Sequence, residues 1–201
     1  MPVLLVHAPG ASSDDYVSVA QHLATHADVY APDLPGHGGS DAPPNAFGVQ
    51  GFAQWLDKWM HVMEIRRASI VTHARGCQIG VELAACDEDL VDRLVLVAPP
   101  DERGARALPA RLLGSLRGRA LRTSARAIED RLPQVRAPVL FVRGEWDARA
   151  SQAWIDWLAD RTRDSRIAVI AGARHDVQDS APDQLARAML PFLREGRIAQ
   201  H

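Results

Sequence analysis

The sequence predicts an α/β fold built on a mostly parallel sheet of about six strands, with helices on both faces. Short apolar runs alternate along the chain with longer segments of helical periodicity. The loops with chemically interesting residues follow the apolar runs, and in parallel sheets such loops meet at the carboxyl ends of the strands. With 201 residues and 47% hydrophobic content, we expect a single domain over residues 1–201 with a sizeable core.

The first third of the chain supplies two strands and two helices. Residues 3–7 form a continuous apolar run closed by Ala8-Pro9-Gly10, which is typical of a buried strand that ends in a loop. A second strand is expected over 28–31, and helices are expected over 14–24 and 52–63. The candidate caps of the first helix are Ser12, Ser13 and Asp14.

A strand, a sharp turn and a helix come next, and the rest of the chain is organised around this turn. The apolar run 69–72 stops abruptly before His73-Ala74-Arg75, and residues 76–85 have helical periodicity. Such a turn lifts one side chain above the edge of a sheet. Here that side chain is the methyl group of Ala74, which can neither attack a carbonyl nor hold a proton.

The second half of the chain repeats the alternation. Strands are expected over 94–98, 139–143 and 167–170. Helices are expected over 152–159 and 182–193, and the last of these begins with a proline in its first turn, as is common. Strands and helices of these lengths favour a parallel sheet covered on both faces.

Several local patterns resemble those of the α/β-hydrolase superfamily, in its esterase and C–C hydrolase-like branch. The turn at Ala74 resembles the nucleophile elbow G-x-S-x-G, with Thr72 in place of the first glycine. Residues 33–41 are close to the family's D-x-P-G-x-G-x-S turn. Residues 144–147 and 172–175 match its G-x-x-D and G-x-x-H patterns. The resemblance implies an α/β-hydrolase fold with a catalytic site at the carboxyl ends of the strands.

The resemblance also implies where the catalytic groups lie. In this superfamily they follow the chain order nucleophile, acid, histidine. Carried over position by position, the nucleophile falls on Ala74, the acid on Asp147 and the base on His175. The carboxylate in such a site fixes the tautomer of the imidazole and stabilises the imidazolium. Glu145 is the rival for the acid, with a less suitable spacing.

An oxyanion site is implied next to the elbow. Its donors would be the N–H of Arg75 and an N–H from the loop after the first strand, at the position of Pro9. Because proline has no N–H, Ala8 or Gly10 would have to substitute. The side chain of Arg75 has two interpretations: it clamps a carboxylate or an anionic oxygen of the ligand, or it extends into solvent.

Two departures from the superfamily are expected. Its usual members open with an antiparallel hairpin, and this chain is predicted to lack it. Residues 99–136 occupy the place of the lid domain, where there is room for about two helices at ~1.5 Å rise per residue. The sequence therefore predicts a much shortened lid.

The composition limits the classes of molecule that we expect the protein to bind. The net charge of −2 gives no case for binding nucleic acid or an anionic membrane. No His/Cys cluster has zinc spacing, so we expect no metal and no cofactor, and we expect Cys77 to be a packing residue rather than a substitute nucleophile. His7, His37 and His73 are expected to shape loops. The expected setting is cytoplasmic, the expected partner is a small-molecule substrate, and open sheet edges leave room for a homodimer.

Three functions remain open. In the first, a His175–Asp147 dyad acts as a general base in non-hydrolytic chemistry of the lyase, cyclase or oxygenase kind. In the second, the protein is a serine esterase or another serine hydrolase in which Ala74 is an introduced substitution. In the third, it is a non-catalytic protein that binds a ligand in a retained pocket. The first is our leading hypothesis.

Overall fold

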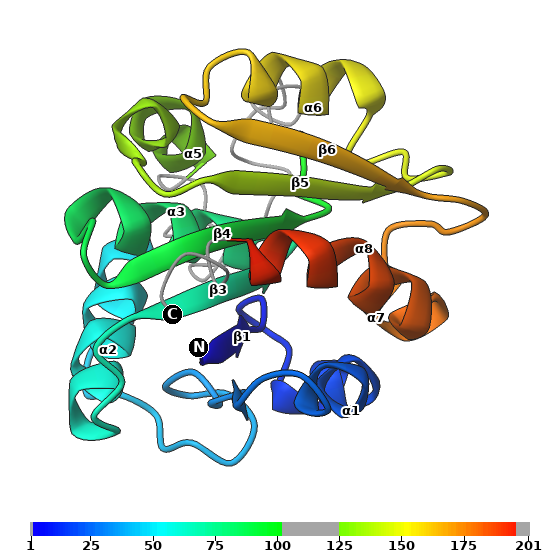
Figure 1. Ribbon diagram of the computed structural model, residues 1–201. Helices are drawn as coiled ribbons and strands as arrows, with labels where there is room; N and C mark the ends of the chain where they lie inside the picture. The colour runs from blue at the N-terminus through cyan, green and yellow to red at the C-terminus, as the bar shows by residue number, and fades with distance from the viewer. Residues whose placement is uncertain (1, 102–124, 196–201) are drawn as a thin grey trace, which may run out of the picture.

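A computed structural model describes residues 2–101 and 125–195, and its centre is one six-stranded sheet (Figure 1). The strands lie in the order β2-β1-β3-β4-β5-β6, and every neighbouring pair is parallel. The strands are β1 (Val3–Val6), β2 (Val29–Tyr30), β3 (Ala68–His73), β4 (Val91–Val97), β5 (Val139–Gly144) and β6 (Ser165–Ile170). The predicted fold class is confirmed.

Helices connect the strands and cover the sheet. Their bounds are η1 (Ser13–Tyr16), α1 (Val17–Ala24), α2 (Val49–Val62), α3 (Gly76–Cys86), α5 (Ala125–Arg131), η4 (Leu132–Gln134), α6 (Gln152–Ala159), α7 (Val177–Ser180) and α8 (Pro182–Arg194). Helix α1 packs against α8, and α3 packs against both α2 and α5 (Figure 1). The two groups lie on opposite faces, which is how a parallel sheet buries both of its sides.

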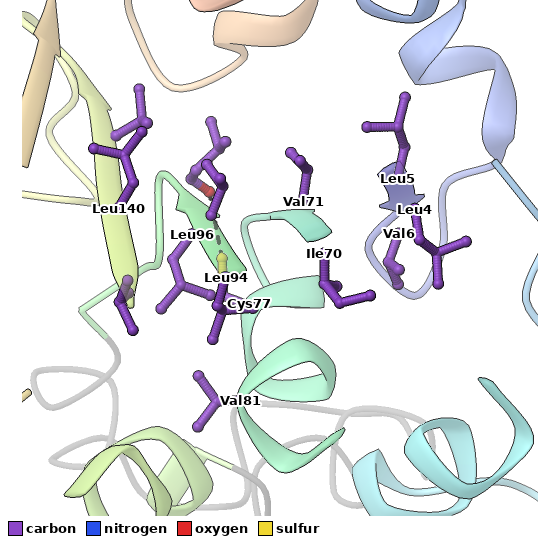
Figure 2. Close-up of a cluster of buried hydrophobic side chains, with 14 of the residues drawn as sticks. Leu4, Leu5, Val6, Ile70, Val71, Cys77, Val81, Leu94, Leu96 and Leu140 are labelled. Atoms are coloured by element: carbon purple, nitrogen blue, oxygen red, sulfur yellow. Dashed lines mark hydrogen bonds between the residues drawn. The ribbon is translucent and has the colours of Figure 1, made fainter. Parts of the chain in front are cut away.

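The core follows from the residues of the central strands. Every residue of β1, β3 and β5 is buried. Figure 2 shows Leu4, Val71 and Leu96, from three neighbouring strands, in one apolar cluster with Val81 of α3. Continuous runs of such residues suit a strand that is covered on both faces, which explains why the sequence shows apolar runs rather than alternation.

The strand order reverses at β1. The chain goes from β1 to β2 on one side and then crosses over to β3 on the other side. In open α/β sheets the ligand crevice lies at the carboxyl ends of the two strands that flank such a point. Here those ends carry the loop after β1 and the turn at Ala74.

The predicted elements are present, with shifts at their ends. Residues 14–24 divide into the 3₁₀ turn η1 and the helix α1, and Ser12 caps η1 by accepting a hydrogen bond from the N–H of Asp14 at 3.3 Å. Helix α2 starts three residues before the predicted 52–63, whereas α6 has the predicted bounds. The four-residue α7 was not predicted, because one turn is too short for helical periodicity.

Most of the predicted lid lies outside the described residues. The prediction covered 99–136, and the structure describes 99–101 and 125–136 of this range, including α5 and η4. Among residues 2–101 and 125–195, none of the helices has the length and apolar character of a membrane span.

Candidate active site

The turn at Ala74 is a tight connection between a strand and a helix, as the sequence predicts. Strand β3 ends at His73 and α3 begins at Gly76, so two residues make the connection. Ala74 has φ 49°, in the left-handed region that non-glycine residues rarely adopt. Its N–H donates to the carbonyl of Val97 at 2.9 Å, and its carbonyl accepts from the N–H of Cys77 at 3.1 Å. The main chain therefore holds the residue in this conformation.

Glycine is required two residues after Ala74. A Cβ on Gly76 would lie 3.0 Å from the carbonyl oxygen of Val6 and 3.1 Å from that of His7. The start of α3 thus packs directly against the end of β1. This contact brings the N–H groups after the elbow next to the loop that begins at Ala8.

Thr72 replaces the first glycine of the elbow motif, and α3 makes room for it. Thr72 is fully buried, and its hydroxyl donates to the carbonyl of Val95 at 3.2 Å. The facing residue on α3 is Gly80, where a Cβ would lie 2.7 Å from Cγ2 of Thr72. The missing Cβ at Gly80 thus leaves space for the Thr72 side chain and keeps the strand and the helix close.

Asp147 and His175 meet at the ends of β5 and β6. Oδ2 of Asp147 lies 2.9 Å from Nδ1 of His175. The carboxylate is buried, and its Oδ1 accepts from the N–H groups of Arg149 at 2.8 Å and Ala150 at 3.1 Å. Burial by itself would raise the pKa of Asp147, but these three hydrogen bonds outweigh it and hold the pKa below its ordinary value. The ionised carboxylate places the proton of the neutral imidazole on Nδ1 and leaves Nε2 as an acceptor.

Glu145 and Arg143 have other positions in the same region. Oε2 of Glu145 accepts from the N–H of Gly172 at 2.8 Å, so this carboxylate ties the two loops together. The guanidinium of Arg143 is buried beneath the acid loop and donates to the carbonyls of Ala150, at 2.8 Å, and Asp147, at 3.2 Å. Our sequence analysis missed Arg143, although an arginine inside an apolar strand is a usable signal for a buried polar contact.

The loop after β1 borders the elbow. It makes a turn in which the N–H of Ala11 donates to the carbonyl of Ala8 at 3.0 Å, and Gly10 has φ 102°. Ala8 and Pro9 are half-buried, and a Cβ on Gly10 would meet no atom within 4 Å. Arg75, on the other side, is exposed and stands at the N-terminus of α3. The predicted oxyanion residues thus lie in two segments, after β1 and at the start of α3, that meet where Gly76 packs against the carbonyls of Val6 and His7.

The hydrogen bonds of Asp33, which is half-buried, fix the neighbouring loop. Asp33 accepts from the N–H of Ser13 at 2.8 Å and from that of Gly39 at 2.7 Å, and these two bonds lower its pKa. Nε2 of His7 accepts from the N–H of Leu34 at 2.9 Å. A Cβ on Gly38 would lie 2.2 Å from the Asp33 carboxyl, which explains the glycine in this motif.

Comparison with known proteins agrees with this geometry. Residues 1–134 match the family model described as alpha/beta hydrolase fold. The chain belongs to the α/β-hydrolase family. An uncharacterized protein of Mycobacterium tuberculosis (strain ATCC 25618 / H37Rv) is 38% identical over 96 residues, which make up 48% of this chain. The match spans only 28% of that relative's length.

Two further likenesses extend over nearly the whole chain. The esterase YbfF of Escherichia coli (strain K12) is 24% identical and is matched over 96% of this chain and 93% of its own. The crystal structure of E-2-(acetamidomethylene)succinate hydrolase has a TM-score of 0.78 at 23% identity, covering 96% of this chain and 91% of that one. These proteins share the α/β-hydrolase fold with this chain.

Cys77 is a packing residue of this α/β hydrolase. Its side chain is fully buried, and Sγ lies 3.4 Å from the carbonyl of Val97 (Figure 2). Burial raises the pKa of the Cys77 thiol to about 12. The thiolate, which is the reactive form, is therefore scarce at neutral pH, and Cys77 is unsuited to act as a nucleophile.

One group of side chains near the dyad has the composition of a metal site. His73, His175 and Asp176 each offer a ligand atom, and these atoms lie within 4.8 Å of one another. Nε2 of His73 and Nδ1 of His175 make hydrogen bonds, so each imidazole has its other ring nitrogen left to offer a metal ion.

Proposed function

We propose that this α/β hydrolase acts on a small organic molecule by using the His175–Asp147 dyad as a general base, without a serine nucleophile. The observation that carries the proposal is the 2.9 Å contact between Nδ1 of His175 and Oδ2 of Asp147, beside an elbow that ends in the methyl group of Ala74. An imidazole is the side chain best suited to take up and return a proton near neutral pH.

The chemistry that follows is proton abstraction. Nε2 of His175 takes a proton from an acidic C–H, O–H or N–H of the substrate, and Asp147 stabilises the resulting imidazolium. The anion left on the substrate needs donors, and the N–H of Arg75 and the loop from Ala8 to Gly10 are the candidates, because the start of α3 packs against the end of β1. Reactions that begin this way include eliminations, cyclisations and oxygen additions to an activated carbon.

A carboxylate-bearing substrate fits Arg75. The side chain of Arg75 is exposed at the N-terminus of α3, where the helix dipole also favours negative charge. The succinate hydrolase that shares this fold is a relative whose name describes a substrate of this class. This proposal predicts that Arg75→Lys, which keeps the charge but not the bidentate geometry, raises KM more than it lowers kcat.

The second candidate is a serine hydrolase in which Ala74 is an introduced residue. The observation that favours it is the left-handed backbone of Ala74, because an elbow is retained there although alanine gains nothing from it. Relatives described as an esterase and a hydrolase have the same fold. The third candidate, a protein that only binds the ligand, requires neither the dyad nor the elbow to be assembled for chemistry.

A paired assay of the protein and its Ala74→Ser variant tests these proposals. Both are given a short-chain p-nitrophenyl ester and a fluorophosphonate probe. If serine restores turnover and labelling, the dyad and the oxyanion donors are assembled for hydrolysis, and the second candidate is preferred. If serine restores neither, the site is used for other chemistry or for binding alone.

The substitution His175→Ala then separates the two remaining candidates. Candidate substrates with acidic protons are screened with the unaltered protein, and any turnover is measured again in the variant. Turnover that persists in His175→Ala contradicts the general-base proposal. Binding that persists in both proteins, without turnover in either, supports the third candidate.

A further inference from the structure

His73 connects the elbow to the loop that carries His175. It is the last residue of β3, directly before Ala74, and its side chain is 7% exposed. Nε2 of His73 lies 3.1 Å from the carbonyl oxygen of His175, and the centroids of the two rings are 5.2 Å apart at 51°. The residue next to the nucleophile position therefore touches the backbone of the proposed base.

The direction of this hydrogen bond follows from its partners. Burial is the largest influence on His73 and lowers its pKa, so the ring is neutral at neutral pH. A carbonyl oxygen can only accept, which places the single ring proton on Nε2. The same carbonyl also accepts from the N–H of Val177 at 3.0 Å, so both of its lone pairs are in use.

The loop of His175 is held differently on its two sides. On the side of the acid, the N–H of Trp146 donates to the carbonyl of Ala173 at 2.9 Å. A Cβ on Gly144 would lie 2.1 Å from the carbonyl of Arg174, so the two loops are in backbone contact. On the side of the elbow, within the described residues, the His73 side chain makes the hydrogen bond to this loop.

We propose that His73 is a positioning residue: its Nε2–H holds the carbonyl of His175 and thereby sets the distance between residue 74 and the imidazole of the base. The inference rests on the proposed function, in which His175 is the base. The hydrogen bond itself can be tested without any substrate. A ring that only fills space is the competing explanation, and it makes a different prediction for a phenylalanine at this position.

A set of His73 variants separates the two explanations. Phenylalanine keeps an aromatic ring and removes the donor. Glutamine places an amide N–H near the position of Nε2, whereas asparagine places it closer to the backbone, out of reach of the carbonyl. The control is His37→Phe, which changes a half-buried histidine whose Nδ1 contacts Pro35 in another loop.

The first measurement is the proton NMR spectrum at low temperature. The Nδ1–H of His175 in its bond to Asp147 should give a far-downfield resonance, assigned by its absence in His175→Ala. We expect the unaltered protein, His73→Gln and His37→Phe to show this resonance. In His73→Phe and His73→Asn it should broaden or disappear while circular dichroism shows an unchanged fold. A sharp resonance in a folded His73→Phe or His73→Asn would overturn the proposal.

The second measurement uses the Ala74→Ser background if serine restores esterase activity. There, His73→Phe should lower kcat about 10- to 100-fold with little change in KM, since a displaced base affects the transition state more than binding. His73→Gln should recover most of the loss. If the resonance behaves as expected and neither the ester nor the substrates with acidic protons are turned over in any background, the proposed function fails while the positioning role stands.

Discussion

The turn at Ala74 and the loops of Asp147 and His175 all lie at the carboxyl ends of strands. Side chains contribute hydrogen bonds to the two loops but none to the turn. At Ala74 the main chain makes the hydrogen bonds and the methyl group adds none. At the dyad, the carboxylate of Asp147 accepts hydrogen bonds from His175, Arg149 and Ala150. The side chain of residue 74 therefore adds nothing to the hydrogen bonding of its turn, whereas loss of the Asp147 carboxylate would remove three hydrogen bonds.

This difference affects how the contact between Asp147 and His175 is interpreted. Asp147 has a structural role as well as a proposed chemical one, so its presence by itself does not demonstrate catalysis. The side chain of Ala74, by contrast, is a methyl group that makes no hydrogen bond. Experiments have to separate the structural contribution of Asp147 from its contribution to proton transfer.

The largest expected effect is on catalysis in a chain with a restored serine. If Ala74→Ser hydrolyses p-nitrophenyl acetate, adding Asp147→Asn should lower kcat about 10⁴-fold, because the imidazole loses its correct tautomer. Glu145→Gln in the same background is the control, and it should change kcat by much less because Glu145 contacts Gly172 instead. Equal losses in the two variants would show that Asp147 acts through loop structure alone.

The second prediction concerns stability and its dependence on pH. Asp147→Asn should lower the free energy of unfolding at pH 7 by about 1–3 kcal/mol, since buried donors lose an ionised acceptor. The pKa of Asp147 is lower in the folded state, so its contribution is present above the unfolded pKa of about 3.9 and is lost as pH falls through the folded value. Urea unfolding should therefore show the gap between the two proteins narrowing below about pH 4. A constant gap would contradict this.

The third prediction tests whether the missing Cβ of Gly80 in α3 is what makes room for Thr72 of β3. Gly80→Ala should cost about 1–2 kcal/mol, because the clash with Thr72 outweighs the roughly 1 kcal/mol by which alanine is favoured over glycine in a helix. Adding Thr72→Ser, which removes Cγ2 and keeps the hydroxyl, should recover much of the loss. Additive losses in the double variant, measured by urea unfolding, would show that the two sites are independent.

The smallest expected effect is at the elbow itself. Ala74→Gly should raise the free energy of unfolding by about 0.5–1 kcal/mol, because the relief of the left-handed strain exceeds the entropy that glycine adds to the unfolded chain. Ala85→Gly, in the last turn of α3, should change stability by no more than a similar amount in the opposite direction. A loss of stability at both positions would show that the elbow of Ala74 is not strained.

Much of the fold could be predicted, because the sequence patterns that mark strands, helices and loops are local. Continuous apolar runs marked the buried strands, and glycine and proline marked the loops after them. The family motifs then ordered Ala74, Asp147 and His175 along the chain. The errors lie at element ends and in short elements: η1 was taken for part of the first helix, and the single turn of α7 was missed.

Side-chain contacts across the sheet could not be predicted in the same way. Nothing near Thr72 in sequence indicates that Gly80 makes room for it, because the contact depends on how closely α3 packs on β3. The buried guanidinium of Arg143 and its carbonyl partners likewise depend on the path of the acid loop.

The sequence by itself determined the α/β architecture and the chain order of Ala74, Asp147 and His175, because periodicity and residue identity are local properties. Only the tertiary structure decided that Asp147 rather than Glu145 contacts His175, and that His73 holds the carbonyl of His175 across 102 residues of chain. Hydrogen bonds of this kind depend on distances of a few tenths of an ångström between separate strands, and these distances are set by packing.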